Sequence, residues 1–419
     1  MNYLKFLIAF FIVCNLNSGI AQVDKSIQKA IKYSNKADIL LNKGKIEKSI
    51  LLYSKSIELQ PKKANHYYKR GIAHQTNKNY QKAFADFDKT VQLDTASKKG
   101  YYQRGLAQLK LKNYNAAIAD FEIHKGIVGA NAEGATRSGR AAMGLNDYES
   151  ALKYLEEATK IKANDAEVYR LKAEIYMKME DYAAAEIEIA GVRGLVGGDT
   201  KLDLMEARCA IERKNAKRAK TLLNKLLINN PNDASYNLLS KAYSIESNQD
   251  SALYCVNKAI ELKPTAEYYF NRGTYAALKG DTLDALKDFN TALELDPTYL
   301  EAYNHRTYYV WIPQEKYSNA INDMNAFIEA NSSNTFAFNN RSYVHFKLGN
   351  LDQAFVDACH SLNIKMNNGY VFKNLTLYYY SFGEMEMARK TANFALTNNY
   401  MVKKDQEFNA VLDALGISY

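Results

Sequence analysis

Apolar and small residues recur at helical spacing along most of the chain, in blocks separated by short polar turns. Residues 98–131 show the pattern clearly, in one block and then a second: Tyr101, Gly105, Gln108, then Tyr114, Ala117, Phe121 and His124. The polar pair Lys112-Asn113 lies between the blocks. A period near 3.6 residues predicts a helix for each block. This window therefore predicts a helical hairpin.

The same pattern returns every 33 to 35 residues. A small residue or threonine marks the first helix of each copy: Ala37, Gly71, Gly105, Gly139, Ala173, Ala207, Ser240, Gly273, Thr307, Ser342 and Thr376. A second ladder follows twelve or thirteen residues later: Ser49, Ala83, Ala117, Ala151, Ala185, Ala219, Ala252, Ala285, Ala320, Ala354 and Ala388. Two ladders in phase indicate one unit copied eleven times. Because a lone hairpin leaves an apolar face uncovered, each copy must stack on the next.

The repeat unit resembles the tetratricopeptide repeat across residues 30–402. The residues that carry the resemblance are Tyr-Tyr-Lys-Arg-Gly at 67–71, Tyr80 with Ala83 and Phe87, and Leu-Glu-Leu-Asp-Pro at 293–297. The resemblance implies an all-α fold, a right-handed superhelical solenoid of about eleven tetratricopeptide hairpins. It also implies that the first helices line a concave face.

The register of the ladders sets the expected limits of each part. We expect a signal peptide at 1–21, a flank at 22–29, and repeats at 30–63, 64–97, 98–131, 132–165, 166–199, 200–232, 233–265, 266–299, 300–334, 335–368 and 369–402. In the remaining segment, 403–419, apolar residues recur at i, i+3, i+4 and i+7: Phe408, Val411, Leu412 and Leu415. This spacing predicts a helix that caps the last repeat.

Two places depart from the regular pattern. Repeat nine carries one extra residue around Trp311, Ile312 and Pro313, which we place in the turn between its helices. Repeat five ends in a glycine cluster, at Gly191, Gly194, Gly197 and Gly198. The cluster is either a loose end of the second helix or a hinge between repeats five and six, and both interpretations stay open.

The first residues have the pattern of a targeting signal. Lys5 gives a basic start, residues 6–13 are apolar, and Gly19 and Ala21 are small residues before a cleavage point. This predicts export after cleavage behind Ala21, to the periplasm or the cell envelope. A membrane anchor and a lipoprotein with Cys14 lipidated are the alternatives. No other stretch is apolar enough to span a membrane, and the lysine, asparagine and tyrosine usage favours a bacterial source.

The net charge of +9 is uneven along the chain. Residues 22–131 hold 21 Lys and Arg against 9 Asp and Glu, a net charge of +12. Residues 132–419 hold 33 against 37, a net charge of −4. The basic third could meet an anionic membrane surface or an acidic partner. The alternative is that scattered lysines only solvate one end of the array.

No motif in the sequence indicates catalysis. Beyond the signal, Cys209, Cys255 and Cys359 have no metal or redox spacing and fall in predicted helices, so we expect buried, unreactive thiols. The histidines form no metal signature, and the glycines form no phosphate loop. We expect a protein that is not an enzyme and uses no cofactor and no metal.

Five repeats combine an arginine with an aspartate. Arginine directly precedes the small residue at Arg70, Arg104, Arg272, Arg306 and Arg341. The same repeats place aspartate on the second helix, at Asp86, Asp120, Asp288, Asp323 and Asp357. The correlation predicts five structural ion pairs that bridge the two helices of a repeat. In repeat five, Lys172 and Glu188 take these positions.

The positions that face inward in the family form three zones. Repeats two and three offer Tyr68 and Tyr102, and repeats four to six are charged, at Arg137, Arg140, Arg170, Glu174 and Arg208. Repeats eight to eleven are rich in aromatic and amide residues and are our predicted partner site: Phe270, Asn304, Tyr308, Trp311, Phe336, Asn339, Tyr343, Phe346, Tyr370, Lys373 and Tyr380. Trp311, the only tryptophan, is the expected anchor. The alternative is that these side chains pack between neighbouring repeats.

The sequence favours a non-catalytic protein–protein interaction scaffold of the cell envelope that binds a protein or peptide in its groove. One alternative is an envelope-assembly component docked on an anionic membrane through residues 22–131. Another is a glycan-binding module that uses the aromatic zone. Nucleic acid is a disfavoured partner, because export separates the chain from RNA and the aromatic zone is not the basic one.

Overall fold

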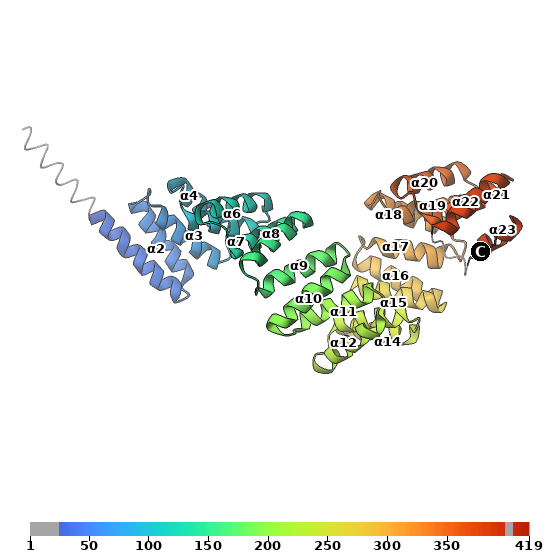
Figure 1. The fold of residues 1–419 in the computed structure, drawn as a ribbon, viewed down its shortest axis with the longest axis horizontal. Helices are drawn as coiled ribbons and strands as arrows, with labels where there is room; N and C mark the ends of the chain where they lie inside the picture. Colours follow the sequence, from blue (N-terminus) through green and yellow to red (C-terminus); the bar gives the residue numbers. More distant parts are fainter. Residues whose placement is uncertain (1–24, 399–404, 419) are drawn as a thin grey trace, which may run out of the picture. The chain divides into compact units, whose positions relative to one another are not determined.

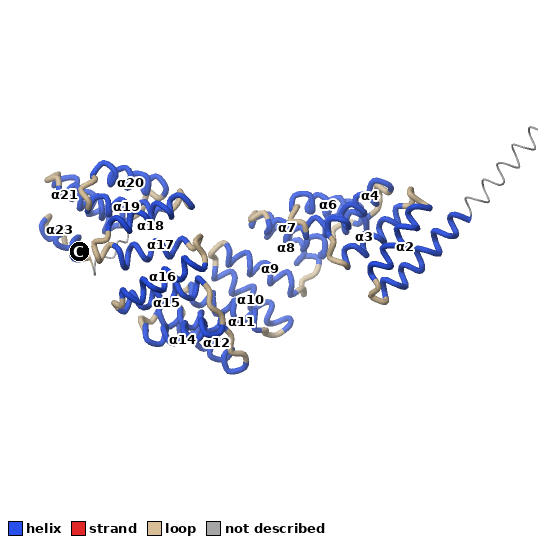
Figure 2. The backbone as a smooth tube through the Cα atoms, turned by 180° about the vertical axis from the view of Figure 1, so that it is seen from behind, coloured by secondary structure: helices blue, strands red, loops and turns tan. Residues whose placement is uncertain are grey.

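The computed structural model describes residues 25–398 and 405–418 (Figure 1). The predicted signal peptide and Cys14 lie outside these residues. The described part of the chain is built from helices joined by short turns, and it contains no strand (Figure 2). The all-α fold class is therefore confirmed.

The chain divides into two compact units, residues 1–199 and 200–419. The first unit contains a helix described over 25–42, followed by α2 (Ile46–Leu59), α3 (Ala64–Thr76), α4 (Tyr80–Leu93), α5 (Lys98–Lys110), α6 (Tyr114–Val128), α7 (Ala132–Gly144), α8 (Tyr148–Ile161), α9 (Ala166–Lys178) and α10 (Tyr182–Val196).

The second unit begins with α11 (Thr200–Glu212), α12 (Ala216–Asn229), α13 (Asp233–Ile245), α14 (Gln249–Leu262), α15 (Ala266–Lys279), α16 (Thr282–Leu295), α17 (Leu300–Arg306) and the π-helix η1 (Thr307–Trp311). It continues with α18 (Tyr317–Ala330), α19 (Thr335–Lys347), α20 (Leu351–Ile364), α21 (Gly369–Ser381), α22 (Met385–Thr397) and α23 (Gln406–Ala414).

Within each unit the helices pack in consecutive pairs, and each pair packs on the next. Helix α3 pairs with α4, α5 with α6 and α15 with α16, while α4 also contacts α5 and α14 contacts α15. Apolar residues on the inward faces of these helices fill the spaces between pairs, as stacking of repeat units requires. The core is therefore a series of small clusters, one between each pair and its neighbour.

The ladder of small residues marks the closest approach of the two helices in a pair. A Cβ atom on Gly71 would lie 2.6 Å from the ring of Phe87, and one on Gly105 would lie 2.8 Å from the ring of Phe121. Both rings are fully buried. A larger residue at the ladder position would therefore push the second helix away.

Repeat nine departs from its neighbours inside the helix and not in the turn. The turn residue with positive φ comes seven residues after the ladder residue in repeat three, where Lys112 follows Gly105. In repeat nine it comes eight residues later, where Glu315 follows Thr307. The extra residue is absorbed by η1, a single π-helical turn. Our placement of the extra residue in the turn was wrong.

The glycine cluster lies directly before the division between the two units. Helix α10 continues through Gly191 and Gly194, and it ends where Gly197 adopts a φ of 78°. Glycine reaches this backbone conformation without the steric cost that other residues meet. A hinge function of this segment stays a prediction.

Two further expectations concern the whole chain. No helix among residues 25–398 and 405–418 has the length and apolar character needed to cross a membrane. Cys209 and Cys255 are buried, as expected, but Cys359 is exposed. The prediction of three buried cysteines was wrong at Cys359, because this residue lies on the outward face of α20.

Candidate functional site

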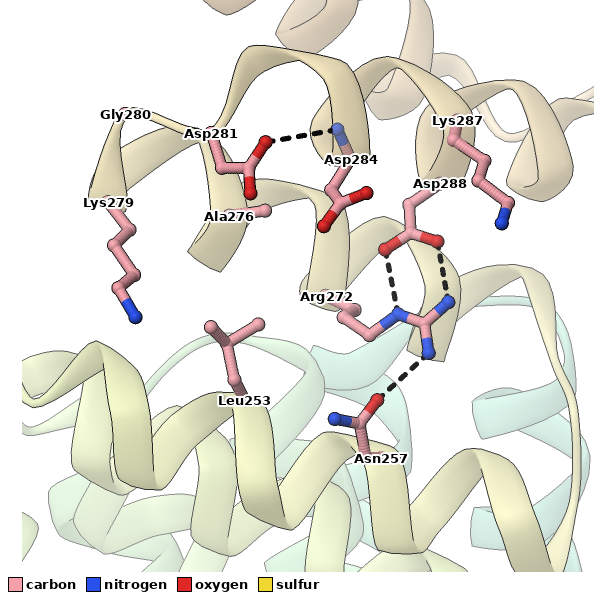
Figure 3. Close-up of a pocket in the computed structure, with 10 residues that line it drawn as sticks. All are labelled: Leu253, Asn257, Arg272, Ala276, Lys279, Gly280, Asp281, Asp284, Lys287 and Asp288. Carbon is pink, nitrogen blue, oxygen red and sulfur yellow. Dashed lines mark hydrogen bonds and ion pairs between the residues drawn. The ribbon is translucent and has the colours of Figure 1, made fainter.

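Every one of the five predicted Arg–Asp pairs forms in the structure, with both aspartate oxygens engaged. The guanidinium of Arg272 donates to the two carboxylate oxygens of Asp288 at 2.8 and 2.7 Å (Figure 3). The other pairs have the same two-bond geometry: Arg70 with Asp86, Arg104 with Asp120, Arg306 with Asp323 and Arg341 with Asp357. Each aspartate is buried. The pairs hold the two helices of a repeat together.

The third guanidinium nitrogen links each of these repeats to the one before it. In repeat eight, Nη1 of Arg272 donates to Asn257 of α14 at 2.8 Å (Figure 3). The equivalent acceptors of the other arginines, in repeat order, are Ser54, Asp88, Asn290 and Asn325. An aromatic ring three residues before the arginine covers the guanidinium: Tyr67, Tyr101, Tyr269, Tyr303 and Phe338. We call this arrangement the arginine clamp.

The acceptor from the preceding repeat was missed by the sequence analysis, although a signal for it exists. Asp88, Asn290 and Asn325 each lie two residues after the paired aspartate of their own repeat. A polar residue at that position accepts a hydrogen bond from the arginine of the next repeat. The substitute pair in repeat five also forms, with Lys172 Nζ 2.6 Å from Glu188.

A cavity of about 820 Å³ lies beside the clamp of repeat eight, between α14, α15 and α16. Charged side chains of both signs line it, among them Lys279, Asp281, Asp284 and Lys287 (Figure 3). Lys279, which lines the cavity, also pairs with Asp250 of α14 at 2.6 Å. No group of three or more metal-ligating side chains occurs among the described residues.

Trp311, the predicted anchor of the partner site, is 8% exposed and faces the core. Its indole Nε1 donates to Asp323 at 2.8 Å. In repeat three the same role belongs to Gln108, which donates to Asp120 at 2.7 Å. The π-helical turn adds one residue, and this brings Trp311 to the position that Gln108 occupies. The expectation that Trp311 contacts a partner is therefore overturned.

The two predicted asparagines join neighbouring first helices. Asn374 of α21 donates to the side-chain oxygen of Asn339 at 2.9 Å and to its backbone oxygen at 3.1 Å. Asn340 donates to the side-chain oxygen of Asn304 at 2.7 Å. Asn237 and Asn271 form the same joint between repeats seven and eight. Asn339 is buried, which removes it from the predicted partner site.

Three predicted aromatic residues pack between repeats. The ring of Phe270 lies 4.7 Å from that of His305, and Phe346 lies 4.5 Å from Tyr378. Tyr380 is half-buried against the apolar cluster of the last repeats. These contacts agree with the alternative that the aromatic side chains pack inside the array.

Tyr343 and Lys373 contact the C-terminal helix α23. The hydroxyl of Tyr343 donates to Glu407 at 2.6 Å, and the ammonium of Lys373 lies 3.3 Å from Asp405 and 4.3 Å from the Tyr343 ring centroid. Burial lowers the pKa of Lys373, while the two carboxylates act in the opposite direction. We call Tyr343, Lys347 and Lys373 the α23 dock.

Three aromatic side chains of successive repeats remain exposed. Tyr308 is 53% exposed, Phe336 50% and Tyr370 43%. The rings of Phe336 and Tyr370 lie 6.3 Å apart, and the pKa of Tyr308 is raised because the ring is half-buried and because the negative charge of Asp405 is nearby. We call these three residues the exposed aromatic cluster, and its Tyr370 lies three residues before Lys373 of the α23 dock on α21.

Two arginines of the charged zone join neighbouring repeats. Arg137 and Arg140 of repeat four both lie within 3.2 Å of Glu167 of repeat five, whereas Arg170 binds Asp199 within repeat five. The first two arginines therefore stabilise the stacking of repeats four and five.

Four segments of the chain match family models. Residues 37–78 match a TPR repeat model, and residues 99–122, 142–194 and 266–299 match tetratricopeptide repeat models. No curated protein is similar to the sequence.

Among solved structures, MamA 41-end from Desulfovibrio magneticus RS-1 is 22% identical, with a TM-score of 0.39, over 40% of this chain and 94% of that one. A tetratricopeptide repeat protein from Parabacteroides merdae ATCC 43184 is 15% identical, with a TM-score of 0.48, over 56% and 93%. Yeast Tom70 is 12% identical, with a TM-score of 0.49, over 93% and 96%. The four family matches and the packing of consecutive helix pairs support the tetratricopeptide repeat family for this chain.

Proposed function

We propose that the chain is a non-catalytic scaffold that binds a protein or peptide partner at the exposed aromatic cluster of its second unit. The observation that carries the proposal is the exposure of Tyr308, Phe336 and Tyr370. Exposed rings of this size on three successive repeats supply a large apolar contact area. Contiguous apolar surface of this kind marks interaction sites on soluble proteins.

Most of the other predicted site residues are buried or bonded to neighbouring side chains, including Trp311, Asn339 and Lys373. Aromatic side chains have few rotatable bonds, so a partner would lose little of its binding energy to ordering these rings. We therefore expect the hot spot at the cluster and not at Trp311.

The test is a binding comparison between the wild-type chain and a triple variant, Tyr308→Ala, Phe336→Ala and Tyr370→Ala. Affinity capture from extracts of the source cells identifies the partner, and titration of the purified partner measures its dissociation constant. We expect the triple variant to weaken binding by about 100-fold or more, since each truncated hot-spot ring costs at least about 1 kcal/mol.

A matched control is Tyr254→Ala. Tyr254 lies on α14 of the same unit and is as exposed as the cluster residues, but it lies outside the cluster. This control should bind like the wild type. Equal affinity of the triple variant and the wild type would refute the proposed site, and binding of a glycan in place of a protein would change the partner class.

We further propose that the scaffold acts after export. The basic start, the apolar run and the small residues that end at Ala21 support a cleaved signal. Amino-terminal sequencing of the protein purified from its source should begin at Gln22. A first residue of Met1 would contradict export by this route.

A further inference from the structure

The C-terminal helix α23 does not continue the repeat array. Of the two helices in the pair before it, a first helix such as α13 or α15 packs more on the second, α12 or α14, than on the first. Helix α23 instead packs on α21, which is the first helix of the preceding pair. Its contacts extend one repeat further back, since Glu407 reaches Tyr343 and Lys347 of α19. Helix α23 thus contacts the first helices of the last two repeats.

The contacts of α23 combine a charged end with an apolar stripe. At its start, Asp405 faces Lys373 at 3.3 Å, and Glu407 accepts from Lys347 at 2.7 Å and from Tyr343 at 2.6 Å. Along the rest of the helix, the apolar residues of the stripe are buried against α21 and α22: Phe408, Val411, Leu412 and Leu415. Carboxylates followed by apolar residues at i, i+3, i+4 and i+7 describe an acidic amphipathic helix.

Charge complementarity explains why this surface selects such a helix. Lys373 is 8% exposed with α23 in place, and its compensation comes from carboxylates of α23. A buried ammonium is costly without a partner of opposite charge, so an occupant that lacked carboxylates would be disfavoured. Burial acts to raise the pKa of Glu407, but the hydrogen bonds from Lys347 and Tyr343 outweigh it and the pKa falls below its ordinary value.

Helix α23 itself is short. A nine-residue helix is marginal in water without packing partners, so its structure depends on the surface that it occupies. This makes exchange with a competing helix of the same chemistry feasible, because no independent fold of α23 must be broken.

We propose that the α23 dock is the receptor for an acidic amphipathic helix of a partner protein, and that α23 occupies it as an internal competitor. The proposal rests on the proposed scaffold function and names the partner class of that face. The partner helix carries two carboxylates at its amino-terminal end and apolar residues at the spacing of Phe408, Val411 and Leu412. It displaces α23 when it binds, and its contacts then continue toward the exposed aromatic cluster.

The probe for the test is a synthetic acetylated peptide with the sequence of residues 405–418, isotopically labelled and tagged with a fluorophore. The receptor is the full chain, either wild type or with Asp405→Asn and Glu407→Gln, which remove the charges of α23 and keep its shape. The chain with the two substitutions should bind the peptide roughly 10- to 100-fold more tightly than the wild type. Its own α23 has lost the charged contacts and therefore occupies the dock less often. A matched peptide with both carboxylates replaced by amides should bind neither chain.

Hydrogen exchange on the wild-type chain gives a second readout that needs no substitution. Saturating peptide should remove protection from the amides of α23 while α19 and α21 stay protected. Equal affinity of both chains for the peptide, equal binding of the amide peptide, or unchanged protection of α23 would each overturn the proposal. A concentration-dependent dimer that exchanges α23 between copies would overturn it too, since the occupant would then be a second copy.

The two proposals fail in different ways. The peptide titration uses no natural partner, so it tests the dock alone. The triple variant of the aromatic cluster tests partner binding and leaves the dock residues in place.

Discussion

Removing one half of an arginine clamp should cost far more than removing a surface ion pair, and the two halves should not cost the same. The pair Arg272–Asp288 of repeat eight is the best place to measure this. The side chain of Asp288 is 4% exposed and that of Arg272 is 27% exposed. Arg272→Ala therefore leaves a carboxylate buried without its two donors, whereas Asp288→Ala leaves a guanidinium that still reaches Asn257 and solvent.

The magnitudes follow from this asymmetry. Breaking a buried pair by removing one partner costs about 3–5 kcal/mol. Because Arg272 is partly exposed, we expect about 3 kcal/mol for Arg272→Ala and about 2 kcal/mol for Asp288→Ala. The double variant should cost about 3 kcal/mol, less than the sum of the single changes, which corresponds to a coupling of about 2 kcal/mol.

Hydrogen exchange of the backbone amides in α15 and α16 is the appropriate assay. Repeat arrays open locally, so a change in one clamp appears first in the helices that it joins. The control is Lys279→Ala on α15, which removes an exposed pair with Asp250 and should leave exchange unchanged. If Arg272→Ala behaves like Lys279→Ala, or if the effects of the two clamp substitutions simply add, the clamp is not a coupled structural unit.

Three further predictions address other features of the fold. Gly105→Ala should destabilise α5 and α6 by about 1–3 kcal/mol in urea unfolding, because its Cβ would lie 2.8 Å from Phe121, whereas Gly126→Ala, with no atom near its Cβ, should be neutral or stabilising. Trp311→Phe removes the donor to Asp323 and should cost about 1–3 kcal/mol without weakening partner binding; weaker binding with unchanged stability would restore Trp311 to the partner site. Burial lowers the pKa of His305 from its ordinary 6.5 to about 4. Between these two pH values the folded state binds fewer protons than the unfolded state. The free energy of unfolding should therefore fall as the pH drops from 6.5 to 4, by up to about 3 kcal/mol. His305→Phe should flatten the pH dependence between 6.5 and 4, and an unchanged profile in urea titrations at several pH values would show that another group is responsible.

The clamp pairs could be predicted from sequence because the two helices of a repeat have the same arrangement in every copy. Arg104 and Asp120 lie on two helices joined by a turn of nearly fixed length, so a correlation between the positions implies a contact. The third hydrogen bond of Arg104, to Asp88, joins one repeat to the next, and the spacing of residues inside a repeat does not predict it. The signal becomes visible only when the stacking of neighbouring repeats is known.

Trp311 could not be placed by periodicity. The alternation of faces along a helix assumes about 100° of rotation for each residue, so one additional residue moves every later side chain to another face. Whether an extra residue enlarges the turn or forms a π-helical turn depends on the packing around it. In repeat nine, burial of the indole and its hydrogen bond to Asp323 accompany the π-helical turn.

The position of α23 could not be predicted from the sequence, because it depends on contacts between residues far apart in the chain. The apolar spacing predicted a helix that covers the end of the array, and the structure has this helix with Phe408 and Leu412 fully buried. The contacts of Glu407 with Tyr343 and Lys347 join residues 64 and 60 positions apart. Lysine and tyrosine at those positions look like free ligand-binding groups until the acidic residues of α23 are placed beside them.

The exposed aromatic cluster and the α23 dock are neighbours on α21. Lys373 of the dock lies one helical turn after Tyr370 of the cluster, and Asp405 at the start of α23 lies 3.3 Å from Lys373. A partner that covers the rings of the cluster therefore meets the start of α23, which it either contacts or replaces. In both cases partner binding and α23 docking share a coupling free energy, and that coupling is reciprocal. Substitutions at Asp405 and Glu407 should therefore change the affinity for the natural partner, although neither residue belongs to the aromatic cluster.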